Sequence, residues 1–306
     1  MDTVAVSVCI PAYRKPDQLI RLLESLLLQR FSNYEVIVSD DSPDNSVRII
    51  CEQYQHKLPL QYFHNQPALG SPENWNNAIR KAKGKWIKLM HDDDAFATPD
   101  SLGALYALTS GGADFVFSGY NVVEETSIRS SHHIAPSWVE KLNQDPRLLL
   151  SNNVIGHPSV TMHLNNGRLW YDKRMKWMVD IDFYVRCMQQ GSFNYSTEPL
   201  INIGHHEAQI TRSVFLDKKV VVPENMLLLH KLGEELLGNV QIYDYYWRLL
   251  RNYNIGSETE LQQLSPVAVP EKIKKMLKFQ RMFPQWLLKI GPVSKVLMVL
   301  SRMLNR

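Results

Sequence analysis

WIKLMHDDDAFATP, residues 86–99, joins a short apolar run to three consecutive carboxylates at positions 92–94. The run over residues 86–90 predicts a buried strand, and Pro99 indicates the start of a helix. Adjacent acids repel one another, so a folded protein keeps them together only where their charge is compensated. A divalent cation is the simplest compensation, because Mg²⁺ and Mn²⁺ prefer oxygen ligands and complete their shells with water and phosphate. The alternative is a solvated acidic turn.

Similar apolar runs recur along the first half of the chain and alternate with segments of helical spacing. Strands are predicted over residues 4–10, 35–39, 60–63, 86–90 and 114–117, and helices over residues 17–29, 43–54, 71–82 and 99–108. This alternation predicts an α/β fold with a mainly parallel sheet flanked by helices. Ligands bind such sheets beyond the carboxyl ends of the strands. Polar groups follow three predicted strands there, at residues 11–13, 40–41 and 92–94, so we expect a nucleotide-binding crevice at this edge.

The second half of the chain is less regular. Residues 151–163 read as a loop that leads into a strand, residues 179–190 have helical spacing, and residues 193–203 predict a strand broken at Glu198-Pro199. From Glu224 onward the pattern is helical. We expect a catalytic domain over residues 1–215, with a nucleotide-binding half (1–120) and an acceptor half (121–215), followed by a helical C-terminal region over residues 216–306.

The composition is that of an ordinary globular protein. With 306 residues, 44% hydrophobic and 21% charged, the chain is long enough for one large domain or for a domain with an appendage. Its three cysteines match no zinc or redox spacing, which favours the cytoplasm. The first residues lack the pattern of a signal peptide, and no long apolar run predicts a transmembrane helix.

The charge is distributed unevenly. Residues 268–306 contain nine Lys/Arg residues and one acid, Glu271, so this segment carries a net charge of +8. Because the net charge of the whole chain is +3, the remaining residues carry −5. Apolar residues between 293 and 304 also recur at helical spacing. A cationic amphipathic segment over residues 270–306 suits the surface of an anionic membrane. The alternatives are a helix packed on the catalytic domain and a homodimer contact, whereas a nucleic-acid partner is excluded by the acidic remainder of the chain and the absence of a recognition motif.

Five segments in this order resemble the family 2 glycosyltransferases, which have the GT-A fold and use nucleotide-sugar donors. They are VSVCIPAYRKPDQLIRLLESLLLQRF (6–31), EVIVSDDSPDNS (35–46), GKWIKLMHDDDAFATPDSL (84–102), MVDIDFYVR (178–186) and HHEAQIT (205–211). The resemblance implies a metal-dependent inverting enzyme with a Rossmann-like GT-A sheet. It does not extend beyond about residue 215.

The resemblance also implies a role for each matching residue. On the donor side, the nucleotide would lie against Pro11, Ala12, Tyr13, Asp41, Asn74 and Asp93, with Asp41 accepting from the uracil N–H and Asp93 near the ribose. Asp94 and His206 would bind Mn²⁺ or Mg²⁺, with His205 as the alternative to His206. His91 replaces the family's first acid, so we do not expect it to contact the metal.

On the acceptor side, Asp180 would be the general base that deprotonates the incoming hydroxyl. Asp182 is the alternative base, although acids in the first turn of a helix also simply complement its dipole. His157 and Ser159 resemble the loop between the donor and acceptor sites.

The implied function is transfer of a sugar, most simply from a UDP-sugar, to a hydroxyl of a glycan acceptor. A membrane-seeking tail favours a lipid-linked oligosaccharide, as in O-antigen or capsule assembly at the inner face of the cytoplasmic membrane. Two rivals remain: a sugar-phosphate nucleotidyltransferase, which the absence of glycine from PAYRKP disfavours, and a non-catalytic glycan-binding module on the same fold.

Overall fold

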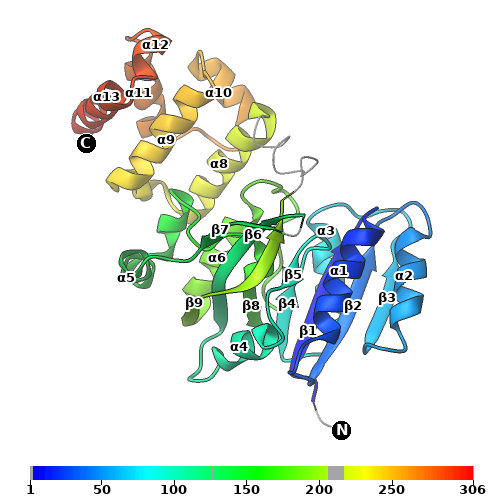
Figure 1. The fold of residues 1–306 in the computed structure, drawn as a ribbon. Helices are drawn as coiled ribbons and strands as arrows, with labels where there is room; N and C mark the ends of the chain where they lie inside the picture. Colours follow the sequence, from blue (N-terminus) through cyan, green and yellow to red (C-terminus); the bar gives the residue numbers. More distant parts are fainter. Residues whose placement is uncertain (1–2, 126, 206–216, 306) are drawn as a thin grey trace. The chain divides into compact units, whose positions relative to one another are not determined.

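The computed structural model describes residues 3–125, 127–205 and 217–305. A nine-stranded sheet with the order β3-β2-β1-β4-β8-β6-β9-β5 dominates the N-terminal part, and β7 pairs with β6 outside this path (Figure 1). The strands are β1 (Val6–Ala12), β2 (Tyr34–Asp40), β3 (Leu60–His64), β4 (Trp86–Leu89), β5 (Ala95–Phe96), β6 (Phe115–Glu124), β7 (Ser127–His132), β8 (Thr161–Leu164) and β9 (Phe193–Gly204). The predicted α/β fold with flanking helices is therefore confirmed.

The first half of the sheet is parallel. Strand β1 pairs with β2 on one side and β4 on the other, and all seven of its residues are buried. Helices α1 (Pro16–Leu27) and α2 (Ser46–Tyr54) lie on one face of these strands and α3 (Glu73–Lys81) on the other (Figure 1), as right-handed crossovers require. The carboxyl ends of β1, β2 and β4, where the predicted nucleotide-binding residues lie, therefore meet at one edge of the sheet.

Three predicted helices begin later than expected: α2 begins at Ser46, three residues after the predicted start at residue 43, and two other starts shift by one or two residues. Pro72 is the N-cap of α3 and not its first residue, and α4 (Ser101–Ala107) begins two residues after Pro99. In both cases the proline lies in the turn that precedes the helix.

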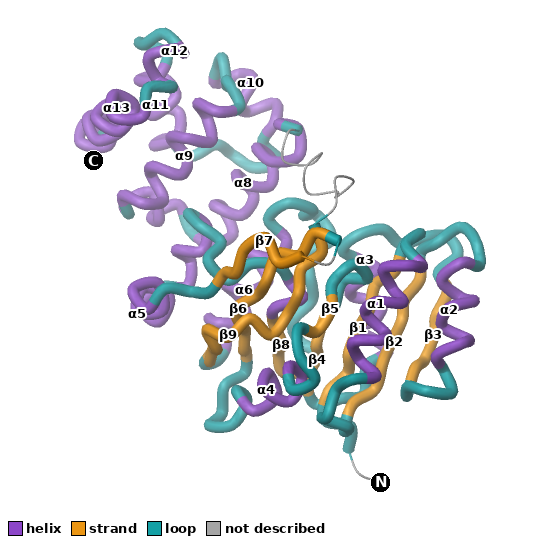
Figure 2. Tube along the Cα trace, in the orientation of Figure 1, coloured by secondary structure: helices purple, strands orange, loops and turns teal. Residues whose placement is uncertain are grey.

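The second half of the sheet is mixed. Strand β8 runs antiparallel to both β4 and β6, whereas β6 and β9 are parallel. The predicted break at Glu198-Pro199 appears as a register shift, because Ser118 pairs with Ser196 and the next residue, Gly119, pairs with Pro199. The short β5 and the exposed β7 were not predicted. Figure 2 shows β7 alongside β6, followed by helix α5 (Pro136–Gln144).

The described chain forms two compact units. The first contains the sheet, helices α1 to α5, and α6 (Val179–Gln190); the second contains, of the described residues, 147–153, 174–178 and 217–305. The second unit is helical, with α8 (Lys218–Leu232), α9 (Val240–Asn252), α10 (Glu258–Leu264), α11 (Glu271–Gln280), α12 (Gln285–Leu288) and α13 (Gly291–Leu304). Among the described residues, no helix combines the length and apolarity needed to cross a bilayer. The domain limits expected from the sequence stay a prediction.

Candidate functional site

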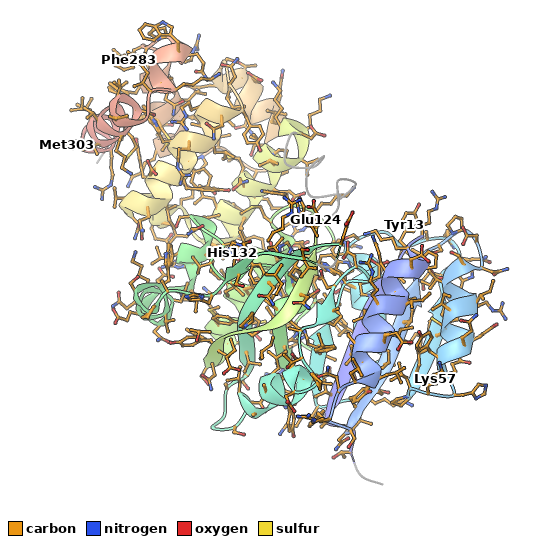
Figure 3. All side chains as sticks on the ribbon, viewed as in Figure 1. Tyr13, Lys57, Glu124, His132, Phe283 and Met303 are labelled. Atoms are coloured by element: carbon orange, nitrogen blue, oxygen red, sulfur yellow. The ribbon has the colours of Figure 1, made fainter. Side chains whose placement is uncertain are left out.

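The ends of β1, β2 and β4 are connected by hydrogen bonds. The backbone N–H of Tyr13 donates to Asp92 Oδ2 at 2.9 Å, and the N–H of Asp41 donates to the carbonyl of Ala12 at 3.0 Å. Tyr13 is exposed beyond the end of β1 (Figure 3), whereas Pro11 and Ala12 are buried within it. The structure therefore brings residues 11–13 between the acidic segment and Asp41.

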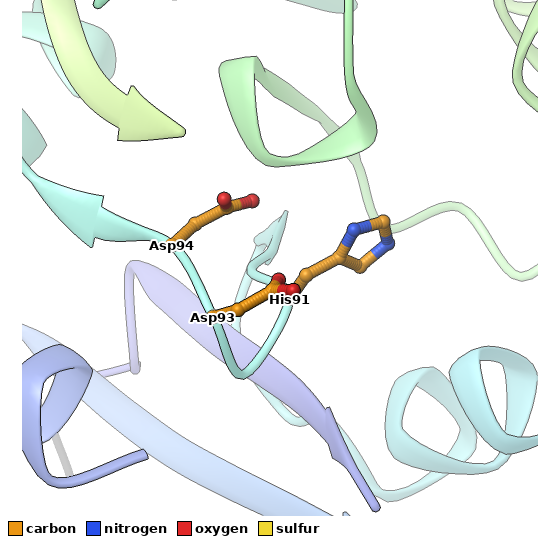
Figure 4. Close-up of side chains that lie close together, drawn as sticks. All are labelled: His91, Asp93 and Asp94. Atoms are coloured by element: carbon orange, nitrogen blue, oxygen red, sulfur yellow. The ribbon is translucent and has the colours of Figure 1, made fainter. Parts of the chain in front are cut away.

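Three side chains of the acidic segment form a compact group. One ligand atom from each of His91, Asp93 and Asp94 lies within 4.8 Å of the others (Figure 4). The Lys15 ammonium donates to Asp93 Oδ2 at 2.7 Å, and Gly204, the last residue of β9, donates its N–H to Asp94 Oδ1 at 3.1 Å. The group is thus held by the start of α1 and by the end of β9.

Ser159 fixes this group from a third direction. It lies in η2 (Pro158–Val160), is fully buried, and its Oγ accepts from the His91 N–H at 2.9 Å. Its hydroxyl is also hydrogen-bonded to the Asp94 carboxylate, and its carbonyl accepts from the buried ammonium of Lys88. The residue expected near the acceptor therefore touches the predicted metal ligand directly.

The electrostatics of the group favour a cation. Burial, reinforced by the charge of Asp93, raises the pKa of Asp92 to about 7 and that of Asp94 to about 8. For Asp93, burial is the largest single effect and raises the pKa, but the charges of Lys15 and His91 and the hydrogen bond from Lys15 together lower it below its usual value. Burial lowers the pKa of His91 to about 4, and its Nε2 finds no hydrogen-bond partner among the described residues. A neutral imidazole beside carboxylates suits Mn²⁺ or a similar divalent ion.

These residues therefore fit the metal that the sequence predicts. The group includes His91, which the sequence analysis did not expect to contact a metal; that expectation stays a prediction. Lys15, which pairs with Asp93 and is not itself a metal ligand, was missed by sequence reasoning; its only signal was a cation two residues after the Tyr13 turn.

Asp41 and Asn74 hold a loop at the neighbouring strand end. Asp41 accepts from Asn65 Nδ2 at 2.9 Å and from the backbone N–H groups of Leu69 and Gly70 at 3.1 and 2.7 Å. The Asn74 side chain accepts from the same Asn65 amide at 3.1 Å. Both residues thus shape the loop over residues 65–70 beside the predicted nucleotide site, and Asp41 retains acceptor capacity on Oδ2.

The predicted acceptor-side residues lie on α6 and on the segment over residues 156–160. Asp180 is half-buried in the first turn of α6, and Asp182 is fully buried and paired with Arg186 at 2.6 Å. The Tyr184 hydroxyl donates to the Gly156 carbonyl at 3.1 Å, next to His157. The segment over residues 156–160 therefore extends from α6 to Asp94. His205 ends the described stretch, and His206 lies outside the described residues.

Several known proteins are similar to this chain over more than half of its length. The chain is 28% identical over 195 residues to an uncharacterized glycosyltransferase of Haemophilus influenzae, covering 61% of this chain and 63% of the relative, just under two thirds of the relative's length. It is 25% identical over 217 residues to the putative colanic acid biosynthesis glycosyl transferase WcaA of Escherichia coli, covering 68% and 76%. Chondroitin synthase of Escherichia coli is 26% identical over 259 residues, 81% of this chain and 35% of the relative.

Solved structures share the fold at lower sequence identity. TarS of S. aureus in complex with UDP-GlcNAc has a TM-score of 0.61 at 17% identity, covering 98% of this chain and 92% of that one. The mannosyltransferase PcManGT from Pyrobaculum calidifontis, in complex with GDP-Man and Mn²⁺, has a TM-score of 0.55 at 14% identity, with coverage of 100% and 88%. Residues 7–168, more than half of the chain, match glycosyl transferase family 2. The chain belongs to glycosyl transferase family 2.

Proposed function

We propose that this glycosyltransferase is metal-dependent and inverting, and that it transfers a sugar from a UDP-sugar to a hydroxyl of a glycan acceptor. The observation on which the proposal rests is the group of His91, Asp93 and Asp94 at the carboxyl edge of the parallel strands. A divalent ion bound there would stabilise the negative charge that develops on the departing diphosphate. Solved structures of the same fold are complexes with UDP-GlcNAc or with GDP-Man and Mn²⁺, which supports a nucleotide-sugar donor and a divalent ion as the ligand classes.

The protein's own residues supply the rest of the donor site. Asp94 is oriented by the Gly204 N–H and by Ser159, and Asp93 is oriented by Lys15. The free acceptor capacity of Asp41 suits the ring N–H of uracil, which is the reason for preferring a UDP-sugar. The exposed ring of Tyr13 offers a face for the base.

Asp180 is proposed as the general base. Inversion requires that the acceptor hydroxyl attacks from the face opposite the diphosphate, and a carboxylate at that face removes its proton as the new bond forms. The half-buried Asp180 can reach a substrate, whereas the carboxylate of Asp182 is fully buried against Arg186. This contrast favours Asp180 over Asp182 for the reaction.

The acceptor is proposed to be a lipid-linked oligosaccharide, as in the assembly of O-antigen or capsule at the inner face of the cytoplasmic membrane. The relative WcaA is named for colanic acid biosynthesis, and another relative is a chondroitin synthase. Both names refer to polysaccharide synthesis, which supports a growing glycan as the acceptor class.

The donor is tested first by thermal shift. The protein with Mn²⁺ is heated with UDP-, GDP-, CDP- or dTDP-sugars, and UDP-sugars are expected to raise the melting temperature most, since a ligand that binds only the folded state stabilises it. A larger shift with another base would overturn the uridine assignment. Release of UDP from the stabilising donor is then measured with Mn²⁺.

Two variants separate the proposed roles. Asp94→Asn should lose Mn²⁺-dependent UDP release, whereas Asp180→Asn should keep donor binding and lose transfer by about 100-fold or more. Asp100→Asn is the matched control, because Asp100 is exposed and its side chain pairs only with Arg30 among the contacts described for it. A donor shift without UDP release by the wild type would favour a binding module, and formation of UDP-sugar from UTP and a sugar phosphate would favour a nucleotidyltransferase.

A further inference from the structure

Helix α13 presents two stripes of opposite character on opposite sides. Ser294, Leu297, Met298 and Ser301 are buried, at the spacing i, i+3, i+4 and i+7. The exposed stripe repeats this spacing two residues later with apolar side chains only: Val296, Val299, Leu300 and Met303. Of the two stripes, the one with serines at its ends is buried and the wholly apolar one faces outward.

The serines explain why the helix is held in this orientation. Ser294 Oγ accepts from Trp247 Nε1 at 2.9 Å and from Arg251 at 3.0 Å, both on α9. Ser301 Oγ is hydrogen-bonded to the Tyr243 hydroxyl at 2.8 Å, also on α9. Rotating α13 to bury its apolar stripe would break these buried hydrogen bonds, and each buried polar group left unpaired is costly. The outward apolar stripe is therefore fixed by the packing of the second unit.

The segment before α13 adds further exposed apolar side chains to those of the outward stripe. Of the fourteen exposed large hydrophobic side chains in the described residues, eight lie between Met282 and Leu304. Trp286 is 67% exposed and Met303 is 60% exposed. Figure 3 shows Phe283 near α12 and Met303 on α13, within the same helical unit. Single exposed apolar residues are normal on a protein surface, but such a concentration marks an interaction site.

Positively charged side chains lie along the same segment. Lys275, Lys278, Arg281 and Lys289 are exposed between α11 and α13, and the exposed Lys295 pairs with Asp244 of α9 at 3.3 Å. From Ala268 to the C-terminus the only acid is Glu271, which pairs with Lys274 at 3.6 Å. Exposed apolar side chains that include a tryptophan, together with nearby Lys and Arg side chains, are typical of helices that lie in the interface of an anionic bilayer.

We propose that α12 and α13 dock on an anionic lipid bilayer, with Trp286, Val296, Leu300 and Met303 inserted among the acyl chains. The exposed Lys and Arg side chains between α11 and α13 favour a bilayer over a second copy of the chain, because two such positively charged surfaces would repel each other on contact. This inference concerns the second unit and does not depend on the proposed transferase activity.

The test is flotation of the full-length protein with vesicles of phosphatidylcholine alone or with 30% phosphatidylglycerol. The wild type should float with the anionic vesicles and bind them about tenfold more strongly than neutral ones, with binding falling as salt rises. A triple variant, Val296→Ser, Leu300→Ser and Met303→Ser, should lose binding about tenfold or more. Its melting temperature should stay unchanged, because these side chains are exposed.

A matched control carries Ile49→Ser and Ile128→Ser, two exposed apolar residues of the first unit, and should float like the wild type. Equal flotation of the triple variant and the wild type would overturn the proposal. So would a wild type that forms dimers in solution, with the triple variant monomeric and neither of them bound to vesicles, since the surface would then be a homodimer contact.

Discussion

Replacing Ser159 with alanine tests how the acidic group is held in place. The change removes one oxygen from a fully buried site and leaves the backbone of η2 intact. It leaves the His91 N–H without its acceptor at 2.9 Å and takes from Asp94 a hydroxyl that is hydrogen-bonded to its carboxylate. Ser159→Ala should therefore both destabilise the first unit and loosen the predicted metal site.

The size of the effect follows from the two lost hydrogen bonds. An unsatisfied buried N–H costs about 1–3 kcal/mol, and a hydrogen bond to the Asp94 carboxyl, which burial keeps largely neutral near pH 7, contributes about 0.5–1.5 kcal/mol. A total loss of about 3 kcal/mol lowers the melting temperature of a domain of this size by about 6–12 °C. Loss of a group that orients a metal ligand typically weakens metal binding by about 10–100-fold.

The assay is thermal unfolding followed by circular dichroism, with and without Mn²⁺, beside a matched serine. Ser118→Ala removes a buried hydroxyl from β6 that donates only to the neighbouring carbonyl of Gly119, at 2.9 Å, among the hydrogen bonds described for it. That control should lose about 1 kcal/mol and keep its Mn²⁺-dependent stabilisation. Equal destabilisation of the two variants, or an unchanged response of Ser159→Ala to Mn²⁺, would refute the reasoning.

Two further predictions concern stability away from the metal group. Burial lowers the pKa of His163 to about 3, so below pH 6.5 the unfolded chain binds a proton at this residue that the folded chain does not bind, and stability falls as pH falls. Between pH 7 and pH 5 the free energy of unfolding of the wild type should therefore fall by about 2 kcal/mol more than that of His163→Leu. Urea unfolding at each pH measures this difference. The Glu224 carboxylate accepts from three consecutive backbone N–H groups at residues 176–178, at 2.7–2.9 Å. Glu224→Gln should therefore lower the free energy of unfolding by about 2 kcal/mol or more, whereas Glu234→Gln, at an exposed residue, should leave it unchanged. Equal urea midpoints for the two variants would contradict this.

Much of the fold could be predicted because its first half is locally encoded. Strand β1 is a continuous buried run, and α6 begins and ends at the predicted residues 179 and 190. Strand β7 could not be predicted, because all six of its residues are exposed and it exists only through pairing with β6. Strand β5 is two residues long and depends on its pairing with β9.

In the candidate site, likewise, some residues could be predicted from the sequence and others could not. The acids were visible as a linear pattern, since residues 92–94 follow a strand directly. Their supports were not visible, because Gly204 lies 110 residues from Asp94 in sequence and Ser159 lies 68 residues from His91. The partnership of Lys15 with Asp93, across 78 residues, likewise depends on the pairing of β1 with β4. Contacts of this kind are set by topology, which no local pattern records.

The central claim is that Asp94 holds a divalent ion that binds a nucleoside diphosphate at the edge of the sheet. Titration calorimetry of UDP binding, with and without Mn²⁺, on the wild type and on Asp94→Asn measures this directly. We predict that Mn²⁺ strengthens UDP binding by about tenfold or more in the wild type and has no effect in Asp94→Asn. UDP binding of equal strength with and without Mn²⁺ in the wild type would contradict the claim.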